Sequence, residues 1–297
     1  MPLSESHLEI IRTVEWMKQI ARLARAEGRI SGFVPTMGAL HEGHISLVRA
    51  ARADCRPVIA SIFVNPAQFG PNEDLQKYPR TFESDRQRLE DAGVDYLFAP
   101  EAAEIYPPGF RTWVNVEGLS ERLEGRVRPG HFRGVTTVVL KLLEIVRPGK
   151  AYFGRKDAQQ ARLIQQMASD LHLDTEIVVC PIVREADGLA LSSRNAYLSV
   201  EERRAAPVLH RALDAVRHSI ENGQRDATRL VAAMREVIGS EPLAQVDYVE
   251  LVNADTLEPV IRLHGSCLVL LAIRFGATRL IDNLLIEEQQ GVFRTTL

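Results

Sequence analysis

The sequence predicts an α/β protein with two parts: a domain built on a mostly parallel sheet and a smaller α+β domain. Through the first two thirds of the chain, short apolar runs typical of strands alternate with segments of helical periodicity, which indicates βαβ units. After Arg184 a turn-rich segment leads to charged helices and then to three strand-like runs. We therefore expect domains at residues 1–187 and 188–297, and a chain of 297 residues is long enough for both.

The elements follow from these patterns in chain order. Apolar runs predict strands over 30–34, 58–64, 95–98, 151–153 and 176–183, and amphipathic periodicity predicts helices over 43–53, 81–92, 135–146 and 157–171. In the second domain we expect helices over 200–222 and 226–239, then strands over 246–252, 267–274 and 278–285. Open parallel sheets bind ligands at the carboxyl ends of their strands, so functional residues are expected there.

Composition restricts the classes of function. The chain is 45% hydrophobic and 25% charged with a formal net charge of -3, and its pI is near 6.3. This balance provides no basic surface for nucleic acid and no polybasic anchor for a membrane. The start of the chain does not read as a signal peptide and no run approaches the roughly 20 apolar residues of a membrane span, so we expect a cytoplasmic protein. Three scattered cysteines indicate buried thiols.

The most informative motif follows the first of these strands. Phe33–Ser46 reads FVPTMGALHEGHIS, in which Pro35 and Gly38 end the strand before an amphipathic helix. His41 and His44 are expected on one face of the first helical turn. A helix N-terminus offers unpaired N–H groups and a partial positive charge, so the segment is predicted to bind a triphosphate.

The histidine pair has two other interpretations, a solvated helix face or half of a metal site. The zinc protease motif places two histidines four residues apart on a continuous helix. Here the second histidine comes one residue early and Gly43 stands before it. Zinc is therefore the minor alternative.

Two amides follow the strand at 58–64. Asn65 and Gln68 each offer a donor and an acceptor, which suits a small substrate with hydroxyl and carboxylate groups. Simple turn chemistry at Asn65-Pro66 is the alternative. The segment 65–80 is long for a loop in a compact domain, and we interpret it as covering the substrate.

Three more polar segments occur at predicted junctions. Residues 154–160 read GRKDAQQ, where Lys156 supplies a charge for phosphate and Asp157 caps the helix or holds a ribose hydroxyl. The loop 191–194 carries two serines and Arg194, whose guanidinium matches phosphate oxygens. The turn 128–134 is basic, and its His131 is open to a substrate-facing or a structural role. A capped helix with a surface lysine and a plain linker remain the alternatives for the first two.

Six segments together resemble the pantoate–β-alanine ligase family. They are TMGALHEGH at 36–44, SIFVNPAQF at 61–69, YPRT at 78–81, HFRGVTTVV at 131–139, GRKDAQQ at 154–160 and READGLALSSRN at 184–195. The family belongs to the nucleotidyltransferase superfamily with a His-x-Gly-His signature. The resemblance implies a Rossmann-like parallel sheet domain with a smaller α+β C-terminal lid domain, and a homodimer.

The resemblance also implies the site. His44, His41 and Lys156 take catalytic positions, and Gln68 and Gln160, with Asn65 beside them, match the residues that hold pantoate. Two residues depart from the common pattern, Arg155 in place of glutamate and Leu191 in place of methionine. The ATP-binding positions implied are Met37, Gly38, Ala39, Leu40, His41, Glu42, Gly43, His44, Gly154, Arg155, Lys156, Asp157, Val183, Leu191, Ser192, Ser193 and Arg194.

The implied reaction is the ATP-dependent condensation of (R)-pantoate with β-alanine to pantothenate through a pantoyl adenylate, with release of AMP and pyrophosphate. It belongs to the biosynthesis of pantothenate (vitamin B5) and coenzyme A. Mg2+ is implied as well, and Glu83 and Asp85 are the acidic residues considered for it, although the ligands are not assigned. The alternatives are a cytidylyltransferase-like enzyme and a non-catalytic nucleotide sensor.

Overall fold

The computed structural model describes residues 8–70 and 74–297 of the chain, which form two compact units. The first unit comprises Met1–Arg155 and Leu163–Cys180, and the second comprises Lys156–Arg162 and Pro181–Leu297. The predicted loop 65–80 includes residues 71–73, which lie outside the described residues, as do residues 1–7 at the start of the chain. In the described part of the chain, no helix has the length and apolar character needed to cross a membrane.

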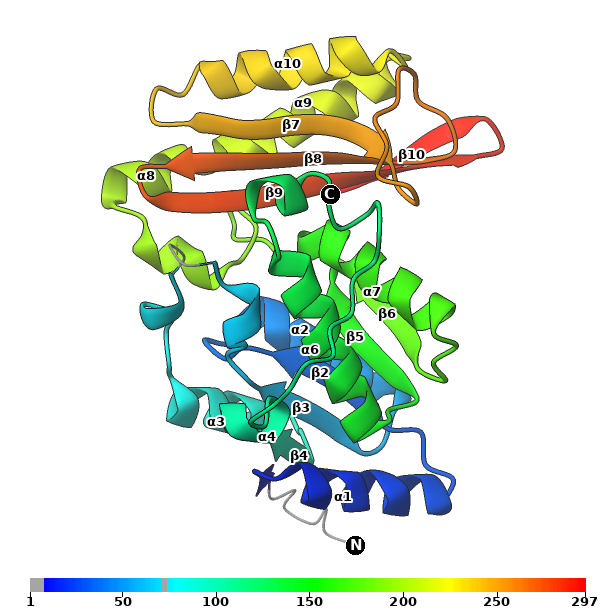
Figure 1. The fold of residues 1–297 in the computed structure, drawn as a ribbon. Coiled ribbons are helices and arrows are strands. Elements are labelled where there is room, and N and C mark those ends of the chain that lie inside the picture. The colour runs from blue at the N-terminus through cyan, green and yellow to red at the C-terminus, as the bar shows by residue number, and fades with distance from the viewer. Residues whose placement is uncertain (1–7, 71–73) are drawn as a thin grey trace, which may run out of the picture. The chain divides into compact units, whose positions relative to one another are not determined.

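The first unit is built on a six-stranded sheet in which every pairing is parallel (Figure 1). The strand order is β1-β4-β3-β2-β5-β6, so the chain moves in one direction from β2 and in the other direction from β5. The carboxyl ends of β2 and β5 therefore flank the switch point, where such sheets bind ligands. The strands are β1 Glu9–Ile11, β2 Gly32–Thr36, β3 Val58–Ile62, β4 Tyr96–Phe98, β5 Lys150–Gly154 and β6 Glu176–Cys180.

Helices cover this sheet with their apolar sides. The helix after β2, α2, packs against β2, β3 and β5 through Val48 and Ala51, which are fully buried. Gly32 permits this packing, since a Cβ there would lie 2.9 Å from the Cβ of Cys55. The helices are α1 Val14–Ala26, α2 Glu42–Asp54, α3 Phe82–Asp91, α4 Ala102–Ile105, α5 Glu124–Val127, α6 His131–Val146 and α7 Ala158–Asp170. All three cysteines are free and buried, as predicted.

The second unit is an antiparallel sheet with the order β10-β9-β8-β7. Two of its helices, α9 and α10, lie side by side on one face (Figure 1), and their apolar residues share a core with the inward residues of the strands. The elements are α8 Val200–Ala205, α9 Val208–Glu221, α10 Ala227–Gly239, β7 Gln245–Asn253, β8 Ser266–Phe275, β9 Thr278–Gln289 and β10 Val292–Thr296.

The fold class is confirmed, with differences at particular elements. The helix predicted over 200–222 is two helices, because Pro207 has no N–H to continue the first one. The strand predicted to reach residue 183 ends at Cys180, since Pro181 cannot donate to the ladder. The helix predicted from 135 begins at His131, and β1, α1 and β10 were not predicted. The domain boundary at residue 187 stays a prediction.

Candidate active site

The turn after β2 is fixed by a buried carboxylate. Gly38 and Ala39 both have positive φ, 82° and 51°. Asp85 of α3, which is 2% exposed, accepts the N–H of Ala39 and that of Leu40, each at 2.8 Å. The hydroxyl of Thr81 donates to the same carboxylate at 3.0 Å. Asp85 therefore sets the conformation of the turn that leads into α2.

The two histidines stand at the start of α2 in a reciprocal capping arrangement. His41 is the N-cap, and its Nδ1 accepts the N–H of Gly43 at 3.2 Å. The Nδ1 of His44 accepts the N–H of His41 at 3.3 Å, and the two ring centroids are 4.2 Å apart. Because each Nδ1 is an acceptor, the neutral rings carry their protons on Nε2. The two rings lie together, but His41 precedes the first helical turn as an extended N-cap and His44 lies within that turn.

The amide of Gln68 is oriented by Asn65. A short 3-10 turn at Pro66–Gln68 follows β3, and the Nδ2 of Asn65 donates to the Oε1 of Gln68 at 3.0 Å. With that oxygen occupied, the Nε2 of Gln68 is the group left to donate, and it lies 3.1 Å from the Sδ of Met37. Asn65 itself is 1% exposed. The structure thus brings Met37, Asn65 and Gln68 together.

Two segments that are distant in sequence support this cluster. The hydroxyl of Tyr106 donates to the Oδ1 of Asn65 at 2.9 Å, and burial raises the pKa of Tyr106 to about 12 although the hydrogen bond with Asn65 lowers it. Helix α6 approaches so closely that a Cβ on Gly134 would lie 2.2 Å from the carbonyl oxygen of Ala67. The Nδ1 of His131 lies 2.8 Å from the carbonyl oxygen of Gln68, which gives this histidine a structural role. Sequence reasoning missed Tyr106, because nothing local marks it.

The segment after β5 begins at the other strand that flanks the switch point. Gly154 ends β5, and a 3-10 turn over Arg155–Asp157 leads into α7. The division between the two units passes through this turn, after Arg155. The side chain of Lys156 is 20% exposed, and its Nζ lies 3.8 Å from the Oδ1 of Asp157. Gln160 is half-buried in the first turns of α7.

In the second unit the remaining predicted residues lie on one hairpin. The N–H of Leu191 donates to the carbonyl of Val183 at 2.9 Å, which pairs these two positions across the turn. Ser192 then caps the short helix Ser193–Tyr197 by accepting the N–H of Arg194 at 3.3 Å. Backbone pairing thus brings Val183 next to Leu191, with the two serines and Arg194 immediately after.

The profile of one protein family, described as pantoate-beta-alanine ligase, matches residues 9–285. The chain belongs to this family. A pantothenate synthetase from Caldicellulosiruptor bescii is 53% identical over 94% of this chain and 99% of the relative. Another from Acidobacterium capsulatum is 59% identical over 90% of this chain and 89% of the relative. The chain is accordingly an enzyme that ligates pantoate and β-alanine.

Solved structures agree with this assignment to the ligase family. The crystal structure of pantothenate synthetase from Thermus thermophilus superposes with a TM-score of 0.88, at 46% identity over 93% of this chain and 98% of that one. A pantoate-beta-alanine ligase from Francisella tularensis, in complex with beta-gamma ATP and beta-alanine, has a TM-score of 0.75 at 37% identity, covering 93% and 97%.

The acidic residues considered for magnesium, Glu83 and Asp85, have protein partners in this ligase. Both oxygens of Asp85 accept hydrogen bonds from the turn, and the exposed Glu83 pairs with Arg86. Over residues 8–70 and 74–297, no group of three or more His, Cys, Asp or Glu side chains is placed to hold a metal ion. Asp85 therefore holds the turn, and the magnesium ligands stay unassigned.

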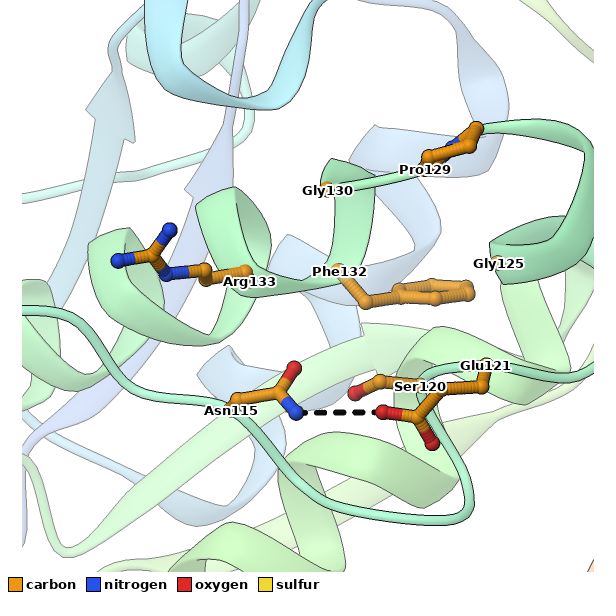
Figure 2. Close-up of a pocket in the computed structure, with 8 residues that line it drawn as sticks. All are labelled: Asn115, Ser120, Glu121, Gly125, Pro129, Gly130, Phe132 and Arg133. Atoms are coloured by element: carbon orange, nitrogen blue, oxygen red, sulfur yellow. Dashed lines mark hydrogen bonds between the residues drawn. The ribbon is translucent and has the colours of Figure 1, made fainter.

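A pocket of about 480 Å³ lies beside the start of α6 (Figure 2). On its wall the Nδ2 of Asn115 donates to the Oε1 of Glu121 at 3.3 Å. The guanidinium of Arg133 lies over the ring of Trp113 at 4.7 Å. The lining residues are Asn115, Ser120, Glu121, Gly125, Pro129, Gly130, Phe132 and Arg133. Pro129, Gly130, Phe132 and Arg133 belong to the basic turn 128–134, and none of the eight lining residues is among the positions predicted to bind ATP or pantoate.

Proposed function

We propose that the ligase condenses (R)-pantoate with β-alanine in an ATP-dependent reaction through a pantoyl adenylate. A carboxylate does not accept an amine until one of its oxygens becomes a leaving group, and transfer of AMP to that oxygen achieves this. The observation that carries the proposal is the reciprocal capping of His41 and His44 at the start of α2, in which each Nδ1 accepts a backbone N–H. We infer that each neutral ring carries its proton on Nε2 as a donor. Donors held in place before the reaction stabilise charge as it develops on a transferred phosphoryl group.

ATP is bound, in this proposal, by the segments that the family resemblance implies. The turn 37–44 offers the two imidazoles to the phosphates, while its N–H groups at Ala39 and Leu40 are held by Asp85. Lys156 supplies a point charge, and Arg194 with Ser192 and Ser193 supplies further donors to the triphosphate. The ATP complex of the Francisella tularensis ligase supports ATP as the substrate.

Pantoate is held by Gln68 and Gln160. Because Asn65 donates to the Oε1 of Gln68, the Nε2 of Gln68 is the group that donates a hydrogen bond to a hydroxyl or carboxylate oxygen of pantoate. Gln160 is half-buried and offers both a donor and an acceptor. Asn65 acts on pantoate through Gln68.

The reaction then has two steps. In the first, a carboxylate oxygen of pantoate forms a bond to the α-phosphorus, and the bond from that phosphorus to the bridging oxygen breaks as pyrophosphate leaves. In the second, the uncharged amine of β-alanine attacks the acyl carbon, loses a proton and displaces AMP from the acyl carbon. The side chains contribute by positioning the reactants and by stabilising charge.

Three further expectations stay proposals. Magnesium is expected with the ATP itself, since Mg2+ is usually bound through substrate phosphates, water and few carboxylates. A homodimer and a cytoplasmic location rest on the family resemblance and on the sequence. The division into domains at residues 1–187 and 188–297 rests on the change of sequence pattern after Arg184.

Exchange of labelled pyrophosphate into ATP tests the mechanism. If an adenylate forms before the amine is needed, exchange requires pantoate and proceeds without β-alanine. His44→Ala should slow this exchange on the order of a hundredfold to a thousandfold, the cost of one lost transition-state donor. A folded His44→Ala variant that exchanges at the normal rate would remove His44 from the chemistry.

The products separate the alternatives. A cytidylyltransferase-like enzyme would form a nucleotide-linked product without consuming β-alanine, and a nucleotide sensor would bind ATP without turnover. Formation of ADP in place of AMP would indicate an acyl phosphate and would overturn the adenylate.

A further inference from the structure

A buried ion pair joins the hairpin of the second unit to strand β9. The guanidinium of Arg184 donates two hydrogen bonds to the carboxylate of Asp282, at 2.6 and 2.9 Å. The Arg184 side chain is 13% exposed and that of Asp282 is 1% exposed. Arg184 also donates to the carbonyl of Gly188 at 3.0 Å, across the turn that connects Val183 to Leu191. Arg184 therefore links the base of the hairpin to β9 through Asp282 and to the tip of the hairpin through Gly188.

The next residue of β9 holds the other ATP segment in this unit. Asn283 is fully buried, and its Nδ2 donates to the backbone carbonyl of Lys156 at 3.1 Å. Its backbone N–H donates to the Oδ1 of Asp282 at 2.8 Å, which ties the side chain of Asp282 to the backbone of Asn283. Two adjacent residues of one strand thus contact two segments that lie far apart in the sequence.

This arrangement has a physical consequence for the cations. Lys156 and Arg194 carry flexible side chains, so the position of their charges depends on how firmly the backbone beneath them is held. In a bidentate ion pair such as Arg184–Asp282, two parallel hydrogen bonds fix the orientation of the guanidinium as well as its distance from the carboxylate. Asn283 can donate to the Lys156 carbonyl in only one orientation of its amide.

We propose that Asp282 and Asn283 are positioning residues that hold Lys156 and the hairpin 183–191 in a fixed relation for binding the triphosphate of ATP. The inference rests on the proposed function, because that function makes these segments ATP ligands. It adds two residues to the machinery that touch neither ATP nor pantoate.

Asn283→Asp tests the proposal, because it keeps the shape of the side chain and replaces the donor with an acceptor that faces the Lys156 carbonyl. The affinity for ATP, measured by titration calorimetry, should fall roughly tenfold, as expected when a buried carbonyl loses its donor. The affinity for pantoate should change less than about twofold. Asn283→Ala, which adds no charge, is expected to act in the same direction and replaces the first variant if that one does not fold.

A double-mutant cycle distinguishes positioning from general stability. Lys156→Ala retains the backbone carbonyl and lacks the ammonium, so in that background Asn283→Asp should change ATP affinity less than about twofold. An equal loss in both backgrounds, or normal ATP affinity in a folded Asn283→Asp variant, would overturn the proposal.

Asp247→Asn is the matched control. Asp247 also accepts hydrogen bonds from two arginines of the same sheet, Arg274 at 3.0 Å and Arg279 at 2.6 Å, but contacts neither ATP segment. The Asp247→Asn variant should bind ATP with the affinity of the wild type. Because ATP affinity is measured without turnover, a wild-type enzyme that binds ATP but lacks pantoate-dependent exchange would refute the proposed function while the test of Asn283 still stands. Absence of ATP binding by the wild type would overturn both.

Discussion

At the scale of single residues, Asn65 shows how burial changes a role. Its Oδ1 accepts from Tyr106 and from the N–H of Ala67, and its Nδ2 donates to Gln68 and to the carbonyl of Gly134. Four protein partners use the full capacity of one amide. Asn65 therefore acts as the support that orients Gln68, whereas the sequence alone suggested a residue beside the substrate.

Asn65→Ala should raise the KM for pantoate roughly tenfold, because it leaves the Gln68 amide free to rotate and buried partners unpaired. Tyr106→Phe removes one of the same hydrogen bonds, so its effect should have the same direction and a smaller size. Steady-state kinetics with each substrate varied in turn provides the measurement. If KM for ATP rises as much as KM for pantoate, Asn65 does not act through Gln68.

At the scale of elements, the start of α2 depends on α3. The turn 37–41 has two consecutive residues with positive φ, Gly38 and Ala39, a conformation that is strained for a residue other than glycine. Asp85 offsets this strain by accepting two N–H groups of the turn. The N-terminus of α2 is thus held from the side by a neighbouring helix.

Asp85→Asn should lower both stability and ATP affinity, since an amide places an NH2 group against at least one backbone N–H. The free energy of unfolding should fall by about 1–3 kcal/mol, the cost of leaving a buried donor unpaired. Urea denaturation and ATP titration measure the two effects. Glu83→Gln, at an exposed position of the same helix, is the control and should change stability by less than about 0.5 kcal/mol. If Glu83→Gln lowers the free energy of unfolding as much as Asp85→Asn does, Asp85 does not stabilise the turn in the way proposed.

At the scale of the whole molecule, one histidine links stability to pH. Burial lowers the pKa of His210 below its usual 6.5, and the nearby Arg184 and Arg217 lower it further, while Asp282 and Asp214 raise it. The imidazole also packs against the hairpin, where a Cβ on Gly188 would lie 2.0 Å from its Cδ2. Protonation of His210 therefore costs more in the folded protein than in the unfolded chain.

The sign of the pH dependence follows from this lowered pKa. Below pH 6.5 the unfolded chain binds a proton at His210 before the folded protein does, so stability falls as pH decreases through the window between the two pKa values. Above pH 6.5 the contribution of the neutral ring is fully present. Urea denaturation of the wild type from pH 8 to pH 5 should show this loss, and His210→Gln should flatten it. A His210→Gln variant with the same pH dependence as the wild type would assign the loss to another group.

The sequence by itself determined the fold class and the family, and it predicted the segments of the site. Alternating strand and helix patterns predict a parallel sheet covered by helices. Polar motifs that directly follow predicted strands, such as those at 37–44 and 154–157, are then expected at the carboxyl edge of that sheet. Periodicity reports which face of an element is buried. It therefore fixes the type and order of elements well and their ends poorly, as at His131 and Cys180.

Only the tertiary structure decided the strand order and the partners of the site residues. Asp85 meets the turn 45 to 46 residues away, Tyr106 meets Asn65 across 41 residues, and Asn283 meets Lys156 across 127. No local pattern encodes such pairings, because they form where the packed chain brings two segments together. A buried polar side chain needs a hydrogen-bond partner in the segment packed against it. For this reason some residues that look like ligands or ordinary strand residues in the sequence serve to hold other residues in place.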